Sequence, residues 1–467
     1  MRKNIVECRD DMDGKASPSS MTRGRRCSIG KGRFFSLVVV LLILVLIASI
    51  FPSCEKSESS YVSYTLKIKE DGTFRILQLT DLHFIDSEET STTVVDDLTL
   101  RDEWVQTAVT DIVERANPDM IIVTGDSIFT NNLISLITGT NDNYKAFQKA
   151  SRFIDSFKIP WAFVFGNHDE EGSLIDSEGS AEEAKALLAA YLKSDELKHC
   201  LFAEGPSGIT GCGNYIVNVL DRDGSVHTSL VLLDSGSYIS VYDESTGETL
   251  GDQWKYEYVH DDQLDWYEKA IRDISRKEGR LVTSMIFQHI PVLAYETAFN
   301  AYRDALEAMG ENWRDTIKAD REYGIDRTLM TEKGEITYHG GVCNKENQQI
   351  CHPFIGTYGG VSFDGGHEFE RVLSLGSTKY IFCGHDHRNT FSFTYQGVRL
   401  TYGMSIDYSA VGLTPPPLAQ NQNIYDETEQ RGGTLITLKE GGIREVTQIP
   451  FTRNLYRETV KERGVKK

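Results

Sequence analysis

Short apolar runs alternate with helical patterns of apolar and polar residues in the first half of the chain after residue 61. The runs Arg75–Thr80, Met120–Thr124 and Trp161–Phe165 have the length and apolar character of buried strands. Between them, Arg101–Ala116 and Tyr144–Phe157 carry apolar residues at helical spacing. This β-α-β-α-β order predicts parallel strands with helices packed outside them.

The second half of the chain is richer in strand patterns. The turn signal DRDG at 221–224 lies between two apolar runs and predicts a hairpin. Residues 332–367 have a weaker, Gly-rich pattern and are predicted to form a long loop. The other elements predicted are helices at 182–193, 263–276 and 299–308, and strands at 215–220, 229–233, 281–288, 380–383, 390–395, 398–402, 434–439 and 443–448.

An uncharged apolar run, FFSLVVVLLILVLIASIF, occupies residues 34–51 and follows a basic segment. Eighteen helical residues span about 27 Å, close to the thickness of a bilayer core. The preceding Lys and Arg residues predict a cytoplasmic N-terminus and an exported, membrane-attached remainder. Two interpretations stay open: an uncleaved signal anchor, or a signal peptide cut before Cys54 as in a lipoprotein. Translation from Met21 would give a more typical leader.

Charge and composition limit the partners that the chain can bind. The net charge is −20, and residues 1–33 carry nine Lys and Arg against four Asp and Glu, so the body is strongly acidic. Such a body disfavours long nucleic acid as a partner. The domains predicted are a basic leader at 1–33, the membrane segment at 34–54, a tether at 55–60, a catalytic domain at 61–455 with a cap or insert at 291–366, and a basic tail at 456–467.

Two pairs of cysteines are close enough in sequence to be disulfide candidates in an exported protein. They are Cys200 with Cys212 and Cys343 with Cys351, and free thiols are the alternative for each pair. Cys383 lies in an apolar run and is predicted to be a buried thiol.

Five short polar motifs directly follow five of the predicted strands. Ligands of open α/β sheets gather at the carboxyl ends of strands, so these motifs are expected to converge on one edge. A glycine in three of them is expected to give the backbone freedom to turn there. Each motif alone has a structural explanation, such as a helix cap, a turn or a core histidine. The motifs are Asp81-Leu82-His83, Gly125-Asp126, Gly166-Asn167-His168-Asp169, His289 before Ile-Pro, and Gly384-His385-Asp386-His387.

Taken together, the motifs supply the ligands of a dinuclear metal centre. They offer carboxylate, imidazole and amide groups without a thiolate, which suits Mn, Fe, Zn or Co. Two such metal ions lower the pKa of a shared water and hold phosphoryl oxygens during in-line attack. The sequence therefore predicts a site for phosphate esters.

The ordered set DxH, GD, GNHD, HxP and GHxH resembles the signature of the calcineurin-like metallophosphoesterase superfamily. The resemblance extends from Asp81 to His387, and it is greatest to the purple acid phosphatase-like branch through LDSG at 233–236, QLDW at 263–266 and GHDHRN at 384–389. It implies an α/β (α+β) fold, a four-layer α/β/β/α sandwich of two mixed sheets.

The same resemblance implies a role for each motif residue. A metal-bridging hydroxide attacks phosphorus, His168 is the general acid, and Asp169 orients His168 and keeps it protonated. Asp126 bridges the two metal ions. The metal ligands implied are Asp81, His83, Asp126 and His387 for one ion, with Asn167, His289 and His385 completing the other.

One position departs from purple acid phosphatases. Those enzymes have a tyrosine ligand three residues after the bridging aspartate, where this chain has Phe129, and they lack the histidine that His83 supplies. The departure implies a colourless site without a tyrosinate-bound ferric ion.

The function predicted is hydrolysis of small phosphate esters, with the choice between monoester and diester left open. The alternatives are a cell-surface binding protein with weak catalysis, and a nucleotide phosphohydrolase or nuclease. Candidates for contacts to the phosphoryl oxygens are Arg388, Asn389, Asn131, Asn132 and His367.

Overall fold

The computed structural model describes most of the chain after residue 60. No helix among the described residues has the length and apolar character needed to cross a membrane. The predicted membrane segment at 34–51 lies outside these residues and stays a prediction. The described residues are 61–85, 100–129, 143–170, 181–243, 245–319, 322–343, 350–407, 431–453, 455 and 458.

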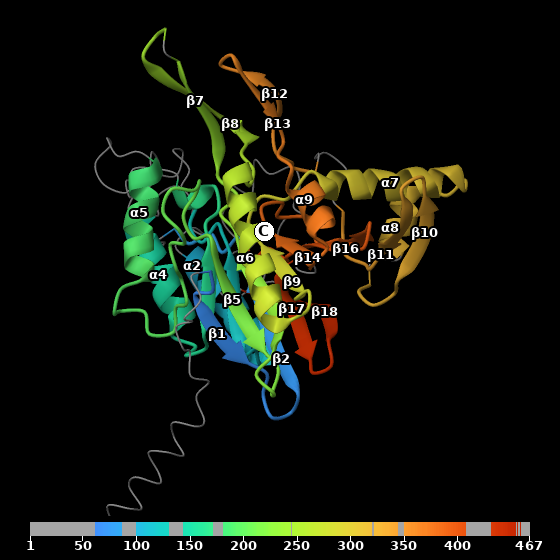
Figure 1. Cartoon of the computed structure of the whole chain (residues 1–467), viewed down its shortest axis with the longest axis horizontal. Coiled ribbons are helices and arrows are strands. Elements are labelled where there is room, and N and C mark those ends of the chain that lie inside the picture. Colours follow the sequence, from blue (N-terminus) through green and yellow to red (C-terminus); the bar gives the residue numbers. More distant parts are fainter. Residues whose placement is uncertain are drawn as a thin grey trace, which may run out of the picture. The chain divides into compact units, whose positions relative to one another are not determined.

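A five-stranded mixed sheet forms one inner layer of the body (Figure 1). Its strands β2, β3 and β4 are parallel, as the β-α-β-α-β pattern predicts, and β17 and β18 add antiparallel neighbours. Strand β3, the middle one of the three parallel strands, is buried along its whole length, because a parallel strand is covered on both faces. In spatial order the strands are β18 (Ile443–Pro450), β17 (Gly432–Lys439), β2 (Thr73–Leu79), β3 (Met120–Thr124) and β4 (Trp161–Val164).

A nine-stranded mixed sheet forms the second inner layer. Its centre is parallel from β6 through β9 and β14 to β16, and antiparallel strands extend it beyond β16. In spatial order the strands are β1 (Tyr64–Lys67), β5 (Tyr215–Leu220), β6 (Val226–Leu232), β9 (Ser284–Phe287), β14 (Thr378–Cys383), β16 (Val398–Tyr402), β15 (Ser392–Tyr395), β11 (Gly334–Tyr338) and β10 (Arg327–Thr331).

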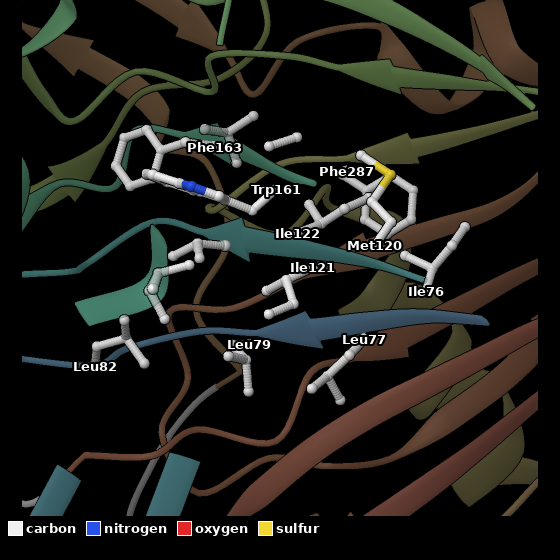
Figure 2. Close-up of a cluster of buried hydrophobic side chains, with 14 of the residues drawn as sticks. Ile76, Leu77, Leu79, Leu82, Met120, Ile121, Ile122, Trp161, Phe163 and Phe287 are labelled. Carbon is white, nitrogen blue, oxygen red and sulfur yellow. The ribbon is translucent and has the colours of Figure 1, made fainter. Parts of the chain in front are cut away.

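The two sheets pack face to face. Figure 2 shows Met120 and Ile122 of β3 beside Phe287 of β9, all of them fully buried. Ile286, the neighbour of Phe287, points to the opposite face and joins a second core cluster. Each sheet therefore buries both of its faces.

Helices cover the two outer faces (Figure 1). α2, α4 and α5 belong to the core of the five-stranded sheet, and α6, α7 and α9 pack on the nine-stranded sheet. This confirms the predicted α/β/β/α sandwich. The helices are α2 (Arg101–Ala116), α4 (Asn143–Asp155), α5 (Ala181–Leu192), α6 (Asp261–Glu278), α7 (Ala294–Ala308), α8 (Trp313–Ala319) and α9 (Glu368–Leu375), with the 3-10 turn η3 (His168–Glu170).

The prediction of a long loop at 332–367 is wrong in part. It contains β11 and a hairpin of β12 (Ile355–Tyr358) and β13 (Val361–Asp364), which contacts a second hairpin of β7 (Tyr238–Asp243) and β8 (Glu248–Tyr256). The strands of the β12–β13 hairpin are exposed along much of their length, so they lack the apolar run by which a buried strand is recognised.

The candidate disulfides are not formed. Cys200 and Cys212 are free thiols, as is Cys351, and Cys383 is fully buried as predicted. The backbone of Cys200 pairs with Trp161 of β4, whereas the Cys212 amide donates to Asp234 Oδ2 at 2.8 Å. The two cysteine segments are therefore held by different neighbours.

Candidate metal centre

The five motifs meet at one edge of the sandwich. Three of them follow the carboxyl ends of β2, β3 and β4, and the other two follow β9 and β14 in the second sheet. Parallel strands end at the same edge, so both sheets contribute ligands to one place.

Four side chains form the group that we call the first site. They are Asp81, His83, Asp126 and His387, whose ligand atoms all lie within 4.8 Å of one another. The Nε2 atom of His83 is 3.6 Å from Asp126 Oδ2, and the Nε2 atom of His387 is 3.5 Å from Asp81 Oδ1.

The second site shares Asp126 with the first. Asp126, His289 and His385 offer ligand atoms within 4.8 Å of one another. Asn167 joins them, because its Oδ1 atom lies 3.1 Å from His289 Nε2 and 2.8 Å from His385 Nδ1. The structure thus brings all seven predicted ligands together, with Asp126 common to both groups.

Two buried carboxylate oxygens show that the residues fit metal ions. Asp81 Oδ2 has no hydrogen-bond partner among the described residues, and Asp126 Oδ2 has no hydrogen bond of good geometry there, although His289 Nε2 lies 3.1 Å away; both residues are at most 1 % exposed. A buried carboxylate oxygen without a donor is costly, and a cation is the partner that such an oxygen requires. The donor set of carboxylates, imidazoles and an amide suits divalent transition metals.

Charges within the centre shift the pKa values of its side chains in opposite directions. Burial raises the pKa of Asp126, but His289 and His168 outweigh it and hold that pKa well below its usual range. For Asp81 burial prevails over His387, and its pKa is raised. Burial lowers the pKa of His289, but Asp126 outweighs it and raises that pKa to about 9.

The backbone at four ligands adopts positive φ angles, although none of the four is glycine. The angles are 52° at Asp81, 53° at His83, 50° at Asp126 and 75° at His385. Asp and His are tolerated in this region better than most residues, yet each such position still costs on the order of 1–3 kcal/mol. Strained backbone of this kind is typical of functional sites.

The motif glycines serve two different purposes. Gly125 has a φ of 81°, as expected of a turn. The expectation of turning freedom is wrong for Gly166 and Gly384, whose φ angles are not positive. A Cβ atom at Gly166 would lie 2.2 Å from Asp126 Oδ1, and one at Gly384 would lie 2.0 Å from the Thr80 side chain. These two glycines leave room for neighbouring motifs.

His168 lies at the border of the centre, beside Asp126. Its backbone amide donates to Asp126 Oδ1 at 2.9 Å, and its Nε2 atom is 3.9 Å from Asp126 Oδ2. Phe129 packs edge-on against the His168 ring at 4.7 Å and is stacked on His83 at 5.1 Å. The His168 side chain remains 17 % exposed, so a ligand from solvent can reach it.

Asp169 connects the loops of two motifs. Its carboxylate accepts the backbone N–H groups of Asp126 at 3.0 Å, Ser127 at 2.9 Å and Gly166 at 2.8 Å. Both oxygens therefore join two motif loops. The expected orientation of the His168 ring by this carboxylate stays a prediction. Burial, with Asp126 nearby, raises the pKa of Asp169 to about 7.

Asp407 is a residue of the centre that the sequence did not reveal. Its Oδ1 atom is 3.0 Å from His83 Nδ1, and its Oδ2 atom is 3.1 Å from His387 Nδ1. Burial opposes ionisation, but His387 and His83 outweigh it and hold the pKa of Asp407 well below its usual range. The only signal in the sequence is a single aspartate five residues after the strand that ends at Tyr402.

Two tyrosines at the base of the β7–β8 hairpin support the second site. Asn167 Nδ2 donates to the Tyr238 hydroxyl at 2.8 Å, which directs the amide oxygen towards the histidines. Tyr256 packs edge-on against His385 at 4.3 Å. The sequence pattern did not predict these strands.

The candidates for phosphoryl contacts fall into different environments. Asn389 is 5 % exposed, and its amide donates to Asp386 Oδ2 at 3.0 Å. His367 faces the carboxylates of Asp261 and Asp364 at the start of α9. Arg388 is half-buried beside His387. Asn131 and Asn132 lie outside the described residues.

The sandwich and its seven converging ligands define a metallophosphoesterase-like centre, and comparison with known proteins agrees. The model of the calcineurin-like phosphoesterase family matches residues 74–313, and the chain belongs to this family.

Individual relatives share only a modest fraction of their residues with this chain. "Probable inactive purple acid phosphatase 28" of Arabidopsis thaliana is 24% identical over 412 residues, which cover 83% of this chain and 85% of that protein. Phosphatase DCR2 of Saccharomyces cerevisiae is 31% identical over 238 residues, 49% of this chain and 36% of that protein. A dimetal phosphatase from Danio rerio matches 81% of this chain and 99% of its own, with a TM-score of 0.37 and 14% identity.

Proposed function

We propose that the protein hydrolyses small phosphate esters with two metal ions and with His168 as the general acid. The observation that carries the proposal is the pair of ligand groups that share Asp126 at the common edge of two sheets. Metal ions bound there would activate water and neutralise phosphoryl charge. Mn, Fe, Zn and Co all suit the donor set.

The chain's own residues then hold the substrate and move a proton. The His168 backbone amide donates to Asp126, and the His168 ring packs against Phe129. These contacts hold the residue in place and leave its imidazole able to protonate a leaving oxygen. Arg388 follows a ligand directly and has no ion pair with a described carboxylate, so it is the cation we assign to the outer phosphoryl oxygens.

The alternative is a binding protein that retains the metals without turnover. The name of the Arabidopsis relative describes that protein as inactive, which favours this alternative. The intact His168 position beside both ligand groups favours the enzyme. Nucleotides belong among the small esters to be tested, whereas the acidic body disfavours long nucleic acid. Attachment to a membrane through residues 34–51, with the catalytic domain outside the cytoplasm, is part of the proposal.

The test is turnover of p-nitrophenyl phosphate and bis-p-nitrophenyl phosphate by protein loaded separately with Mn, Zn or Fe. Turnover is expected, and His168→Ala should lower it by roughly 10²–10⁴-fold while both metals are retained. Asp126→Ala should lose the metals as well. Arg388→Ala should raise the KM of the monoester more than that of the diester. A protein that binds two metals and turns over neither substrate nor any nucleotide would establish the binding alternative.

A further inference from the structure

One buried carboxylate holds two metal ligands that are far apart in the sequence. The two oxygens of Asp407 lie 3.0 Å from His83 Nδ1 and 3.1 Å from His387 Nδ1, and the residue is 3 % exposed. His83 belongs to the first motif and His387 to the last, and both are ligands of the first site.

This contact decides which nitrogen of each ring can bind a metal. A carboxylate accepts a hydrogen bond from the protonated nitrogen, so Nδ1 carries the proton and Nε2 keeps the lone pair. The Nε2 atoms of the two rings are also the ones that face Asp126 at 3.6 Å and Asp81 at 3.5 Å. Asp407 therefore orients both imidazoles at once.

The backbone of Asp407 is fixed on both sides. Its N–H donates to the carbonyl of Asp81 at 2.9 Å, and its carbonyl accepts from Arg431 Nε at 2.9 Å. Asp407 lies beyond residues 74–313, the part of the chain that the family model matches.

Neutral groups contact the side chains of His289 and Asn167 in the second site. His289 Nδ1 is 2.8 Å from the carbonyl oxygen of Thr124, and Asn167 donates to the Tyr238 hydroxyl at 2.8 Å. An anion behind two imidazoles raises their basicity as ligands, whereas a carbonyl or hydroxyl adds no charge. The two sites therefore differ in charge although they share Asp126.

We propose that Asp407 is a positioning residue that sets the metal affinity of the first site, and that Tyr238 does the corresponding work for the second site. The inference rests on the metal binding of the proposed function, but not on turnover. It predicts that substitutions at these two residues weaken different sites.

The experiment measures each site separately by calorimetric titration of the full-length, metal-free chain with Co²⁺ or Zn²⁺. A His289→Ala background leaves the first site, and adding Asp407→Asn should raise its Kd about 10–100-fold. A His387→Ala background leaves the second site, where Asp407→Asn should change the Kd by less than about threefold. Tyr238→Phe should weaken only the second site.

Controls separate a local effect from a general loss of structure. Tyr242 lies on the same strand as Tyr238 and is 66 % exposed. The control variant Tyr242→Phe should therefore leave the metal affinities of both sites unchanged. If Asp407→Asn does not fold, Asp407→Ser is the second variant, with the same selective loss expected. Equal weakening of both sites, or an unchanged first site, would overturn the proposal. If the parent chain binds two metals without turnover, only the proposed catalysis fails.

Discussion

At the residue scale, the ligands themselves carry the unusual backbone conformations. Asp81, His83, Asp126 and His385 hold positive φ angles, and the loops are fixed by bonds such as Asp81 N–H to the Gly125 carbonyl at 3.1 Å. Contacts between motifs thus hold each ligand in place before any metal binds, which is the preorganisation that a metal site needs.

Gly166 gives the sharpest test of this crowding. In Gly166→Ala the new Cβ would lie 2.2 Å from Asp126 Oδ1 and 2.4 Å from Asp126 N, so the shared ligand must move. We expect the variant to lose both metals, measured as metal ions per chain by elemental analysis. Gly251→Ala is the control, because its Cβ would meet no atom closer than 4.0 Å and its φ is not positive. Two metals retained in Gly166→Ala would contradict the crowded arrangement.

At the element scale, local sequence explains where helix α6 begins and ends. α6 starts where the His260 N–H donates to the Gln263 side chain at 2.7 Å, and it ends at Gly279 in the left-handed conformation. Asp261 and Asp262 lie in its first turn, where negative charge is favourable.

The first turn of α9 contains a carboxyl group in an apolar setting. Glu368 is 5 % exposed, and burial raises its pKa to about 8, a shift that the neighbouring Gln288 partly opposes. Between the ordinary pKa of a glutamate and about pH 8, Glu368 is therefore protonated in the native chain and ionised in the unfolded chain. Stability is fully present below that ordinary value and is lost as the pH rises to about 8.

Urea unfolding at pH 5, 6, 7 and 8 measures this loss. One proton corresponds to about 1.4 kcal/mol per pH unit, so the parent chain should lose stability relative to Glu368→Gln across this range. Glu370→Gln changes an exposed residue of the same helix and should follow the parent chain. A constant difference between the parent chain and Glu368→Gln at all four pH values would show that Glu368 does not titrate in this range.

At the scale of the whole molecule, the metal centre joins two sheets. Asp81, Asp126 and Asn167 follow strands of the five-stranded sheet, whereas His289, His385 and His387 follow strands of the nine-stranded sheet. Metal ions bound between them would cross-link the two layers in the native state only.

Metal removal should therefore lower the thermal stability of the entire body. A ligand at 100 times its Kd stabilises the native state by about 2.7 kcal/mol, so chelation should lower the Tm by a few degrees. Calorimetric scans with and without a chelator, followed by return of Mn or Zn, measure the change. The Asp126→Ala chain should not respond to metal, and an equal response in that variant would place the stabilising ions elsewhere.

The sequence by itself determined where the main strands lie along the chain and which seven residues are candidate ligands. Buried parallel strands such as Met120–Thr124 are apolar along their whole length, and each motif follows such a run directly. The rule that parallel strands end at one edge gathers the motifs within each sheet, whereas the packing of the two sheets brings the two groups of motifs together. Local pattern was sufficient for the positions of the strands and the candidate ligands.

Only the tertiary structure decided the contacts between distant segments. Asp407 lies 324 residues after His83, and no local pattern relates the two. The role of Asp169 depends on backbone amides of other motif residues, and the β12–β13 hairpin is too exposed to show an apolar run. The ligands could be predicted because each belongs to a local motif, whereas their supports depend on packing between segments that are distant in sequence.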